Sequence, residues 1–366
     1  MERRFTSRIV CLDWIENSES EKSKISSSIQ EKYEHLRLQY EADLRKNWVE
    51  QLESPNQVLE QLSLAACLIE LWKSMYKTEG ENESQSTVPK FVDIACGNGI
   101  LVYVLRMEGY EGSGYDASRR KSWSTFPPWI QSCLHEKVII PKPFLDMLGP
   151  LEIDIGIESG LFPENTFIIS DHADELTVWT PILAALANPC SPLPFMVVPC
   201  CSRSLAGSYF RYPPGGAGQG YGDSNPGLYG HSCNGISQPC SGDLRALRVA
   251  KMNEKTENGF LSSMVGSLAA KTASIAEEID FGVEKAWLRT PGAVNMALIG
   301  GRNENSNRLK SGEPVTDEEL TAARLKIMEV VERECLQDGG IQAAAQLWID
   351  RLETLRHANQ TQHQPY

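Results

Sequence analysis

The sequence predicts an α/β protein in which a mostly parallel β-sheet is flanked by helices. Short apolar runs of strand length recur between residues 91 and 299, and helical patterns separate several of them, which is typical of a parallel sheet. A helical period before residue 77 and two helical segments after residue 315 indicate helical extensions at both ends. The 366 residues, 41% hydrophobic and 23% charged, suit two domains or one large domain with extensions.

The N-terminal part of the chain divides into two segments. Residues 1–31 are short and become Ser-rich and charged, so we expect a flexible segment that ends in a linker. Residues 32–88 show apolar side chains at three- and four-residue steps, with a turn at Ser54-Pro55-Asn56, and predict a helical extension. We interpret its apolar stripes as packing against the following domain.

Residues 89–301 carry the alternation of strands and helices. The expected strands are Phe91–Ala95, Gly112–Asp116, Val138–Ile140, Thr166–Ser170, Phe195–Val198, Ala286–Leu288 and Val294–Ile299. The expected helices are Ile100–Met107, Glu175–Ala187 and Gly259–Ile279. The last two strands are joined by a short turn, so they predict an antiparallel hairpin that closes the sheet. The Gly- and Pro-rich residues 213–242 predict a long, mobile loop.

Residues 302–366 predict a C-terminal helical extension with a polar tail. Thr316 followed by Glu319 is a capping-type start for a helix that runs to Cys335. Asp338-Gly339-Gly340 breaks this pattern, and a second helix is expected at about Ile341–His357.

Composition excludes two classes of protein. The formal net charge of -13 excludes a protein that grips nucleic acid through bulk positive charge, so any RNA contact must use local basic patches. No window reaches the roughly 18 consecutive apolar residues that a membrane span requires. The N-terminus lacks the apolar core of a signal peptide, so the ten cysteines are expected to be free thiols in a reducing compartment.

The first candidate site follows the strand Phe91–Ala95, where a glycine-containing turn opens a helix. Glycine lets the backbone approach a ligand closely, and Asp116 at the end of the next strand can accept hydrogen bonds from both hydroxyls of a ribose. Asp93 suits a cation better than a pyrophosphate, which favours S-adenosylmethionine (AdoMet) over NAD. A tight turn without a ligand is the alternative. The predicted cofactor-binding residues are Asp93, Gly97, Asn98, Gly99 and Asp116.

A second polar group comes directly after the strand Thr166–Ser170. It contains Asp171, His172, Asp174 and Glu175. Ligands in such sheets bind beyond the carboxyl ends of the strands, so these side chains are well placed for a site. Alternatively, the acids stabilise a helix start through capping and the helix dipole, and both roles can hold together.

A third group follows the strand Phe195–Val198. Cys200 and Cys201 are adjacent, and even with Cys233 and Cys240 their spacing matches no common zinc pattern. We therefore expect packing residues and no metal. Arg203 can bind a phosphate or a carboxylate through two hydrogen bonds.

Five stretches follow one another in the order found in a known family. They are FVDIACGNG, GYEGSGYDASRRKSW, SDHADELTVWTPILAA, FMVVPCCSRS and AWLRTPGAVNMALIGG. Together they resemble the AdoMet-dependent tRNA (uracil-2′-O)-methyltransferases that act on uridine 44 of serine tRNA, and DELT combined with PCC is the most specific part. The resemblance implies a Rossmann-like class I methyltransferase fold, AdoMet as donor, a cytoplasmic location, and methyl transfer to a ribose 2′-oxygen.

This reaction needs alignment of the hydroxyl and help in removing its proton. By position, the candidate catalytic residues are Asp171, His172, Asp174 and Glu175, with Arg203 holding the adjoining phosphate. The candidate RNA-binding residues Arg119, Arg120 and Lys121 follow Asp116 directly. A second basic cluster, Arg245–Lys255, is either a further RNA contact or an ordinary solvated helix face.

Two features depart from the family pattern. Ala95 replaces the usual first glycine of the cofactor turn, which is tolerable if the backbone there has a negative φ. The family generally follows PCC with an aromatic segment that contains Lys or Arg, whereas here SLAGSYFRYPPGG and a Gly-rich loop stand in its place. These departures favour a catalytically inactive methyltransferase-like module that binds RNA or a protein. The acidic net charge would suit a third alternative, a small-molecule or protein methyltransferase on the same fold.

Overall fold

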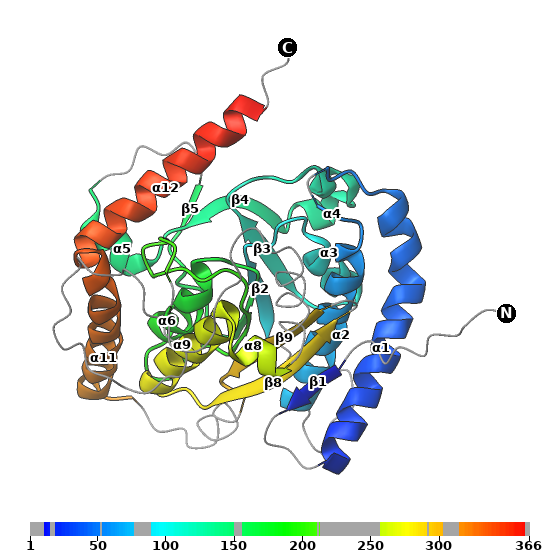
Figure 1. Ribbon diagram of the computed structural model, residues 1–366, viewed down its shortest axis with the longest axis horizontal. Helices are drawn as coiled ribbons and strands as arrows, with labels where there is room; N and C mark the ends of the chain where they lie inside the picture. The colour runs from blue at the N-terminus through cyan, green and yellow to red at the C-terminus, as the bar shows by residue number, and fades with distance from the viewer. Residues whose placement is uncertain are drawn as a thin grey trace, which may run out of the picture.

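The computed structural model of the chain describes residues 11–14, 19–51, 53–76, 89–149, 156–210, 212, 257–290, 293–302 and 315–362. Within these residues, nine strands form one sheet in the order β1-β8-β9-β7-β6-β2-β3-β4-β5, with helices on both of its faces (Figure 1). The predicted Gly-rich loop 213–242 and the basic cluster Arg245–Lys255 lie outside the described residues.

The parallel part of the sheet carries the site. Its strands are β2 (Lys90–Ile94), β3 (Gly112–Asp116), β4 (Leu134–Ile139), β5 (Gly156–Glu158), β6 (Thr166–Asp171) and β7 (Phe195–Val198). The hairpin of β8 (Val283–Thr290) and β9 (Ala293–Gly300) joins β7 through antiparallel pairing. This arrangement confirms the predicted α/β sheet of the Rossmann-like class I methyltransferase type, including its closing hairpin.

Helices cover the sheet in two layers, each with its own apolar core. The first layer contains α1 (Glu19–Lys46), α2 (Gln57–Met75), α3 (Ile100–Met107), η1 (Lys121–Thr125) and α4 (Pro128–Gln131). The second contains α5 (Lys142–Met147), α6 (Leu176–Ala187), α8 (Glu257–Leu261), α9 (Met264–Glu278), α11 (Asp317–Cys335), η2 (Leu336–Asp338) and α12 (Ile341–Gln362). The strands β2, β6 and β7 are buried almost throughout because both faces are covered, and their sequences are accordingly apolar runs.

The N-terminal segment is more ordered than its composition predicted. The strand β1 (Cys11–Trp14) pairs antiparallel with β8, and α1 begins at Glu19, inside the stretch that we expected to be a flexible linker. Backbone pairing with the free edge of β8 explains the strand, since it needs no particular side chains. The helix is held by a buried stripe that packs against α2, namely Ile29, Tyr33, Leu36 and Tyr40.

The C-terminal extension is part of the main core. Thr316 and Glu319 form the predicted capping box of α11, in which Glu319 N donates to Thr316 Oγ1 at 3.2 Å. In α12, Trp348 lies edge-on to Phe144 and Trp179, with ring centroids 5.7 and 6.4 Å apart. Figure 1 shows α11 and α12 lying beside α5 and α6. The two C-terminal helices therefore complete one face of the sheet.

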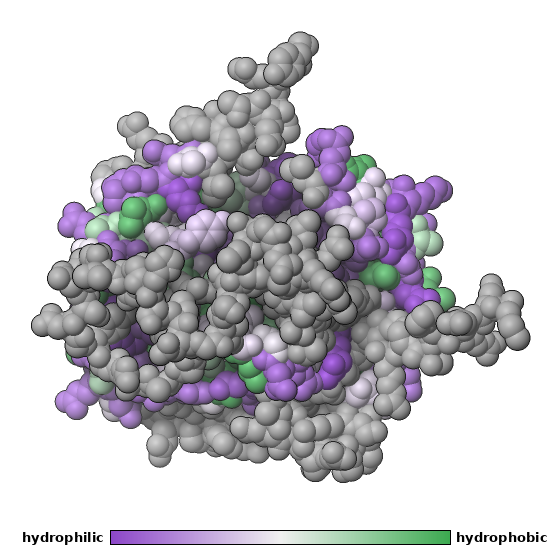
Figure 2. Space-filling view, in the orientation of Figure 1, coloured by the Kyte–Doolittle hydropathy of each residue, from purple (hydrophilic) through white to green (hydrophobic). Residues whose placement is uncertain are grey.

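The described surface is largely polar on the face shown in Figure 2. In the view of Figure 2, the coloured residues are mainly hydrophilic, and apolar residues appear as small separate spots. Among the helices that the structure describes, none combines the length and the hydropathy needed to cross a bilayer.

Candidate active site

A cavity of about 380 Å³ lies at the carboxyl end of β2, which is paired with β3 on one side and with β6 on the other. This is the switch point of the sheet, where ligands of such folds bind beyond the carboxyl ends of the strands. The predicted site residues that line it are Asp93, Gly97, Asn98, Asp116, Arg120, Asp171, His172, Asp174 and Glu175. The first two predicted polar groups therefore belong to one site.

Asp116 of β3 accepts a hydrogen bond from the turn after β2. Gly97 N donates to Asp116 Oδ2 at 2.9 Å, and Ser118 N donates to Asp116 Oδ1 at 2.9 Å. Burial raises the pKa of the Asp116 carboxyl, while the Ser118 bond opposes the rise. Gly99, which does not line the cavity, begins α3 with φ of +73°, and a Cβ atom there would lie 3.1 Å from Leu134 Cδ1. The carboxylate of Asp116 is thus held in a defined orientation at the cavity wall.

Ala95 has a φ of +91°. An alanine is tolerated in the cofactor turn if its φ is negative, and this condition is not met. Its amide and that of Cys96 both donate to Tyr115 O, at 2.8 and 2.9 Å, and these bonds hold the turn in this conformation. An L-residue with a Cβ atom is strained at such a φ. The alanine therefore stores strain in the wall of the cavity, which it lines.

Asn98 ties the turn to the N-terminal helices. Its Nδ2 atom donates to Glu53 Oε2 at 3.0 Å and to Gln57 Oε1 at 2.9 Å, and its Oδ1 atom accepts from Ile100 N at 3.1 Å. With these bonds the side chain positions the turn against α2, a role different from the predicted direct contact with the cofactor.

The surroundings of the Asp93 carboxylate indicate whether the cavity fits a cationic cofactor. Its side chain is only 2% exposed, and its Oδ1 atom has no hydrogen-bond partner among the described residues. Burial, and then the charges of Asp171 and Asp116, raise the pKa of Asp93 well above its usual range. An unpaired buried carboxylate is costly unless a donor or a positive charge compensates it. The amino group and sulfonium of AdoMet are such charges, so the residues present fit this cofactor.

The three predicted RNA-binding residues do not form one patch. Arg119 and Lys121 are exposed, and the Arg119 guanidinium lies 5.6 Å from the ring centroid of Trp123. Arg120 instead lines the cavity, where its charge opposes the rise in the pKa of Asp116. Arg120 is therefore placed on the cofactor side of the site.

The loop after β6 is strained and charged. His172 and Asp174 both have positive φ values, +54° and +47°, and such strain is common at functional sites. His172 Nδ1 donates to Asp171 Oδ1 at 2.7 Å, and Gln61 of α2 donates to Asp171 Oδ2 at 3.0 Å. The Asp171 carboxylate raises the pKa of His172 to about 9. Near pH 7 the imidazole is therefore protonated and cannot accept a proton, whereas Asp171 is held by two donors.

Asp174 and Glu175 bind two arginines instead of capping α6. Glu175 is the first residue before α6, but its side chain makes no capping hydrogen bond. Arg203 Nε lies 3.4 Å from Asp174 Oδ2 and 3.8 Å from Glu175 Oε2, and Arg351 Nη2 lies 2.8 Å from Glu175 Oε2. Arg203 is thereby committed to two carboxylates, which does not support the predicted phosphate contact.

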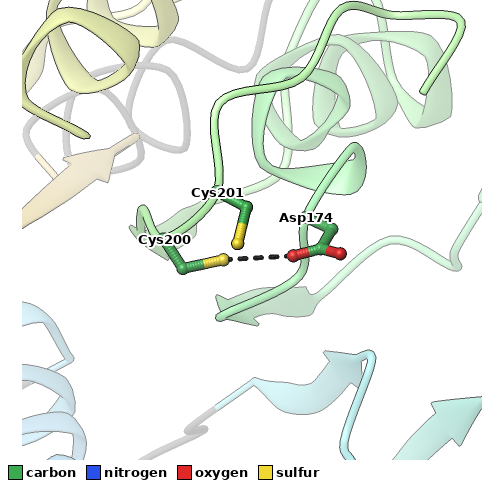
Figure 3. A group of neighbouring side chains, drawn as sticks. All are labelled: Asp174, Cys200 and Cys201. Atoms are coloured by element: carbon green, nitrogen blue, oxygen red, sulfur yellow. Dashed lines mark hydrogen bonds between the residues drawn. The ribbon is translucent and has the colours of Figure 1, made fainter. Parts of the chain in front are cut away.

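The adjacent cysteines lie beside the same carboxylate (Figure 3). Cys200 Sγ donates to Asp174 Oδ1 at 3.4 Å, and the ligand atoms of Asp174, Cys200 and Cys201 all lie within 4.8 Å of one another. Burial raises the pKa of both thiols, which disfavours the thiolate form that binds metals. The other two cysteines considered for zinc, Cys233 and Cys240, lie outside the described residues. The absence of a metal stays a prediction.

Two helices supply wall residues that the motifs did not reveal. From α2 come Gln57, Glu60 and Gln61, and from α12 come Trp348, Arg351 and Leu352. Both sets fall at i, i+3 and i+4 positions, as the residues on one face of any helix do, so their spacing alone does not mark a site.

The strand order, the turn between β2 and α3, and the acids at the ends of β2, β3 and β6 define a class I AdoMet-dependent methyltransferase domain. The model of a family described as "Predicted AdoMet-dependent methyltransferase" matches residues 25–141, which include the turn and Asp116. A solved structure, that of TnmH, aligns with this chain at 13% sequence identity and a TM-score of 0.28. The alignment covers 76% of this chain and 71% of the TnmH chain.

Three curated relatives that carry the same name match parts of this chain. The chain is 46% identical to a tRNA (uracil-O(2)-)-methyltransferase of Aspergillus oryzae over 342 residues, which are 88% of this chain and 54% of that protein. It is 34% identical to the protein of that name from Neurospora crassa, over 75% of this chain and 47% of the relative. It is 43% identical to the protein of that name from Schizosaccharomyces pombe, over 50% of this chain and 36% of the relative. The chain is therefore similar to the tRNA (uracil-O(2)-)-methyltransferases of these fungi, and it spans at most 54% of the length of each of them.

Proposed function

We propose that the protein transfers a methyl group from AdoMet to the ribose 2′-oxygen of uridine 44 in serine tRNA. The observation that carries this proposal is the placement of Asp171 and His172 in the same cavity as Asp93 and Asp116. Bound AdoMet supplies an activated methyl group on a sulfonium, so the chain must align the acceptor hydroxyl and take up its proton. The relatives' names support tRNA as the substrate.

Asp171 is the proposed proton acceptor. Gln61 and His172 each hold one of its carboxylate oxygens, which fixes the orientation of the group, and each oxygen has a further lone pair. Protonated His172 is also a positive charge at the cavity wall, where it favours a developing negative charge on the acceptor oxygen. Glu175 and Arg351 keep the loop after β6 against α12. In this account, Glu175 and Arg203 are positioning residues.

RNA contact is proposed at the exposed side chains Arg119 and Lys121, beside the cofactor end of the cavity. With a net charge of -13, the protein relies on few such contacts, so tRNA binding should depend only modestly on salt. We also propose a cytoplasmic location. This location is what the resemblance to the tRNA (uracil-2′-O)-methyltransferases implies.

The test is a methyl-transfer assay with unmodified serine tRNA, compared with other tRNAs, bulk protein and a metabolite extract. Serine tRNA should be the preferred acceptor. The variant Asp171→Asn keeps the size of the side chain, and it should lower kcat by about 10²–10⁴-fold while AdoMet affinity stays within a factor of about three. Full activity of this variant would remove Asp171 from the mechanism, and methylation of protein or metabolites alone would overturn the tRNA assignment.

A catalytically inactive module is the second candidate, and the strained Ala95 in the cofactor turn favours it. Calorimetric titration with AdoMet separates the two. Stoichiometric binding supports the enzyme, whereas no binding by the folded protein supports the inactive module.

A further inference from the structure

An exposed aromatic side chain stands beside the cavity. Tyr209 is 81% exposed, although its neighbours Ser202 and Ser204 are buried. It lies in the segment that follows Cys201, where the sequence departs from the family pattern. A large exposed aromatic side chain on an ordered loop is a common feature of binding surfaces.

The loop that carries Tyr209 is held by its own hydrogen bonds. Ser204 N donates to Ser208 O at 2.9 Å, Ser202 Oγ donates to Phe210 O at 2.5 Å, and Arg203 and Tyr209 form an isolated antiparallel bridge. Tyr209 is therefore presented by a tight, hairpin-like turn and is already ordered before any partner binds.

Two arginines clamp the tip of this turn. Gly207 O accepts from Arg203 Nη1 at 3.0 Å and also from Arg351 Nη1 of α12. Gly207 has a φ of +82°, a backbone conformation that is strained for a residue with a Cβ atom, and such an atom would lie 3.0 Å from Arg351 Nη1. The two arginines thus connect the position of the turn to α12.

The same arginine connects Tyr209 to the cavity. The Arg203 guanidinium lies 4.0 Å from the centroid of the Tyr209 ring, while its Nε atom lies 3.4 Å from Asp174 Oδ2. Asp174 lines the cavity, so one guanidinium group separates the tyrosine ring from the cavity wall. The face of the ring opposite Arg203 is open to a flat ligand, because Tyr209 is mostly exposed.

We propose that Tyr209, backed by Arg203, is a stacking platform for an unpaired RNA base next to the methylated nucleotide. This inference rests on the proposed function. The carboxylates that line the cavity outnumber its Lys and Arg side chains, so phosphate groups are disfavoured there, whereas a base presents an uncharged face that stacks on tyrosine. The target ribose must enter the cavity, so an adjacent base lies within reach of the platform. The Arg203 guanidinium polarises the ring and fixes its plane.

The test compares variants that keep or remove the aromatic face. Tyr209→Ala should weaken binding of unmodified serine tRNA, and raise its KM, by on the order of tenfold. The AdoMet dissociation constant should change by less than about twofold, and Tyr209→Trp should bind tRNA nearly as the wild type does. Trp129→Ala is the matched control, because Trp129 is also an exposed aromatic beside an arginine, Arg106. Among the described residues, Arg106 forms no ion pair with a carboxylate of the cavity wall, whereas Arg203 does.

An oligouridine that carries one abasic site supplies the second arm. If Tyr209 stacks on a base, the difference between wild type and Tyr209→Ala should shrink when the base at the contact position is missing. Equal tRNA binding by wild type and Tyr209→Ala overturns the platform even if methylation proceeds. If the wild type methylates no tRNA but binds oligouridine through Tyr209, the proposed function fails while the platform stands.

Discussion

Ala95→Gly should stabilise this protein, although glycine normally weakens a fold. The φ of +91° at Ala95 costs about 1–3 kcal/mol for a residue with a Cβ atom. Glycine relieves this strain but adds about 0.5–1 kcal/mol of unfolded-state entropy, so the net gain is about 0–2.5 kcal/mol. With an unfolding entropy of ~2.1 cal/mol/K per residue, this raises Tm by up to roughly 3 °C for cooperative unfolding of the 366 residues.

The assay is paired thermal and urea unfolding of wild type, Ala95→Gly and a control, Ala117→Gly. Ala117 lines the same cavity but has no positive φ, so its replacement should destabilise by about 0.5–1 kcal/mol. Because the Ala95 methyl group also lines the cavity, AdoMet affinity of Ala95→Gly should be equal to or higher than that of wild type. If both substitutions destabilise to the same degree, Ala95 is not strained and the reasoning fails.

Three further outcomes follow from the site. Asp116→Ala should raise the AdoMet dissociation constant well over tenfold, because it removes two ribose acceptors worth roughly 1.5–3 kcal/mol each; an unchanged value in titration of the folded variant would place the ribose elsewhere. His172 has a pKa of about 9, against 6.5 for the free side chain, because of Asp171. Its contribution to stability is full below pH 6.5 and is lost as pH rises through 9, so urea unfolding should show a steeper loss from pH 7 to 9 in wild type than in His172→Gln. Elemental analysis should find no stoichiometric zinc, and one zinc per chain would instead point to Cys200 and Cys201.

Helices, hairpins and caps that depend on a short stretch of sequence were predicted from that stretch. The helix Ile100–Met107 was predicted with its bounds, because an apolar period follows a glycine turn. The closing hairpin and the capping box at Thr316 were also confirmed. The cofactor turn and the acids after β6 were brought to one cavity because parallel strands end at the same edge of a sheet.

Contacts between distant parts of the chain could not be predicted in this way. β1 is ordered by backbone pairing with β8, which leaves no signature in four residues. Arg351 reaches Glu175 from a helix that begins about 165 residues later, and no local motif marks it. The φ of Ala95 is imposed by the hydrogen bonds of its turn to Tyr115 O, so composition alone could not reveal the strain.

The central claim is methyl transfer to one ribose oxygen, and the most direct measurement uses serine tRNA ligated to carry 2′-deoxyuridine at position 44. Methyl transfer from AdoMet is followed by nuclease digestion and mass spectrometry of the nucleosides. The expected result is a single 2′-O-methyluridine from the unmodified tRNA and no product from the deoxy substrate. Equal methylation of the deoxy substrate, or a methyl group on the uracil ring, would contradict it.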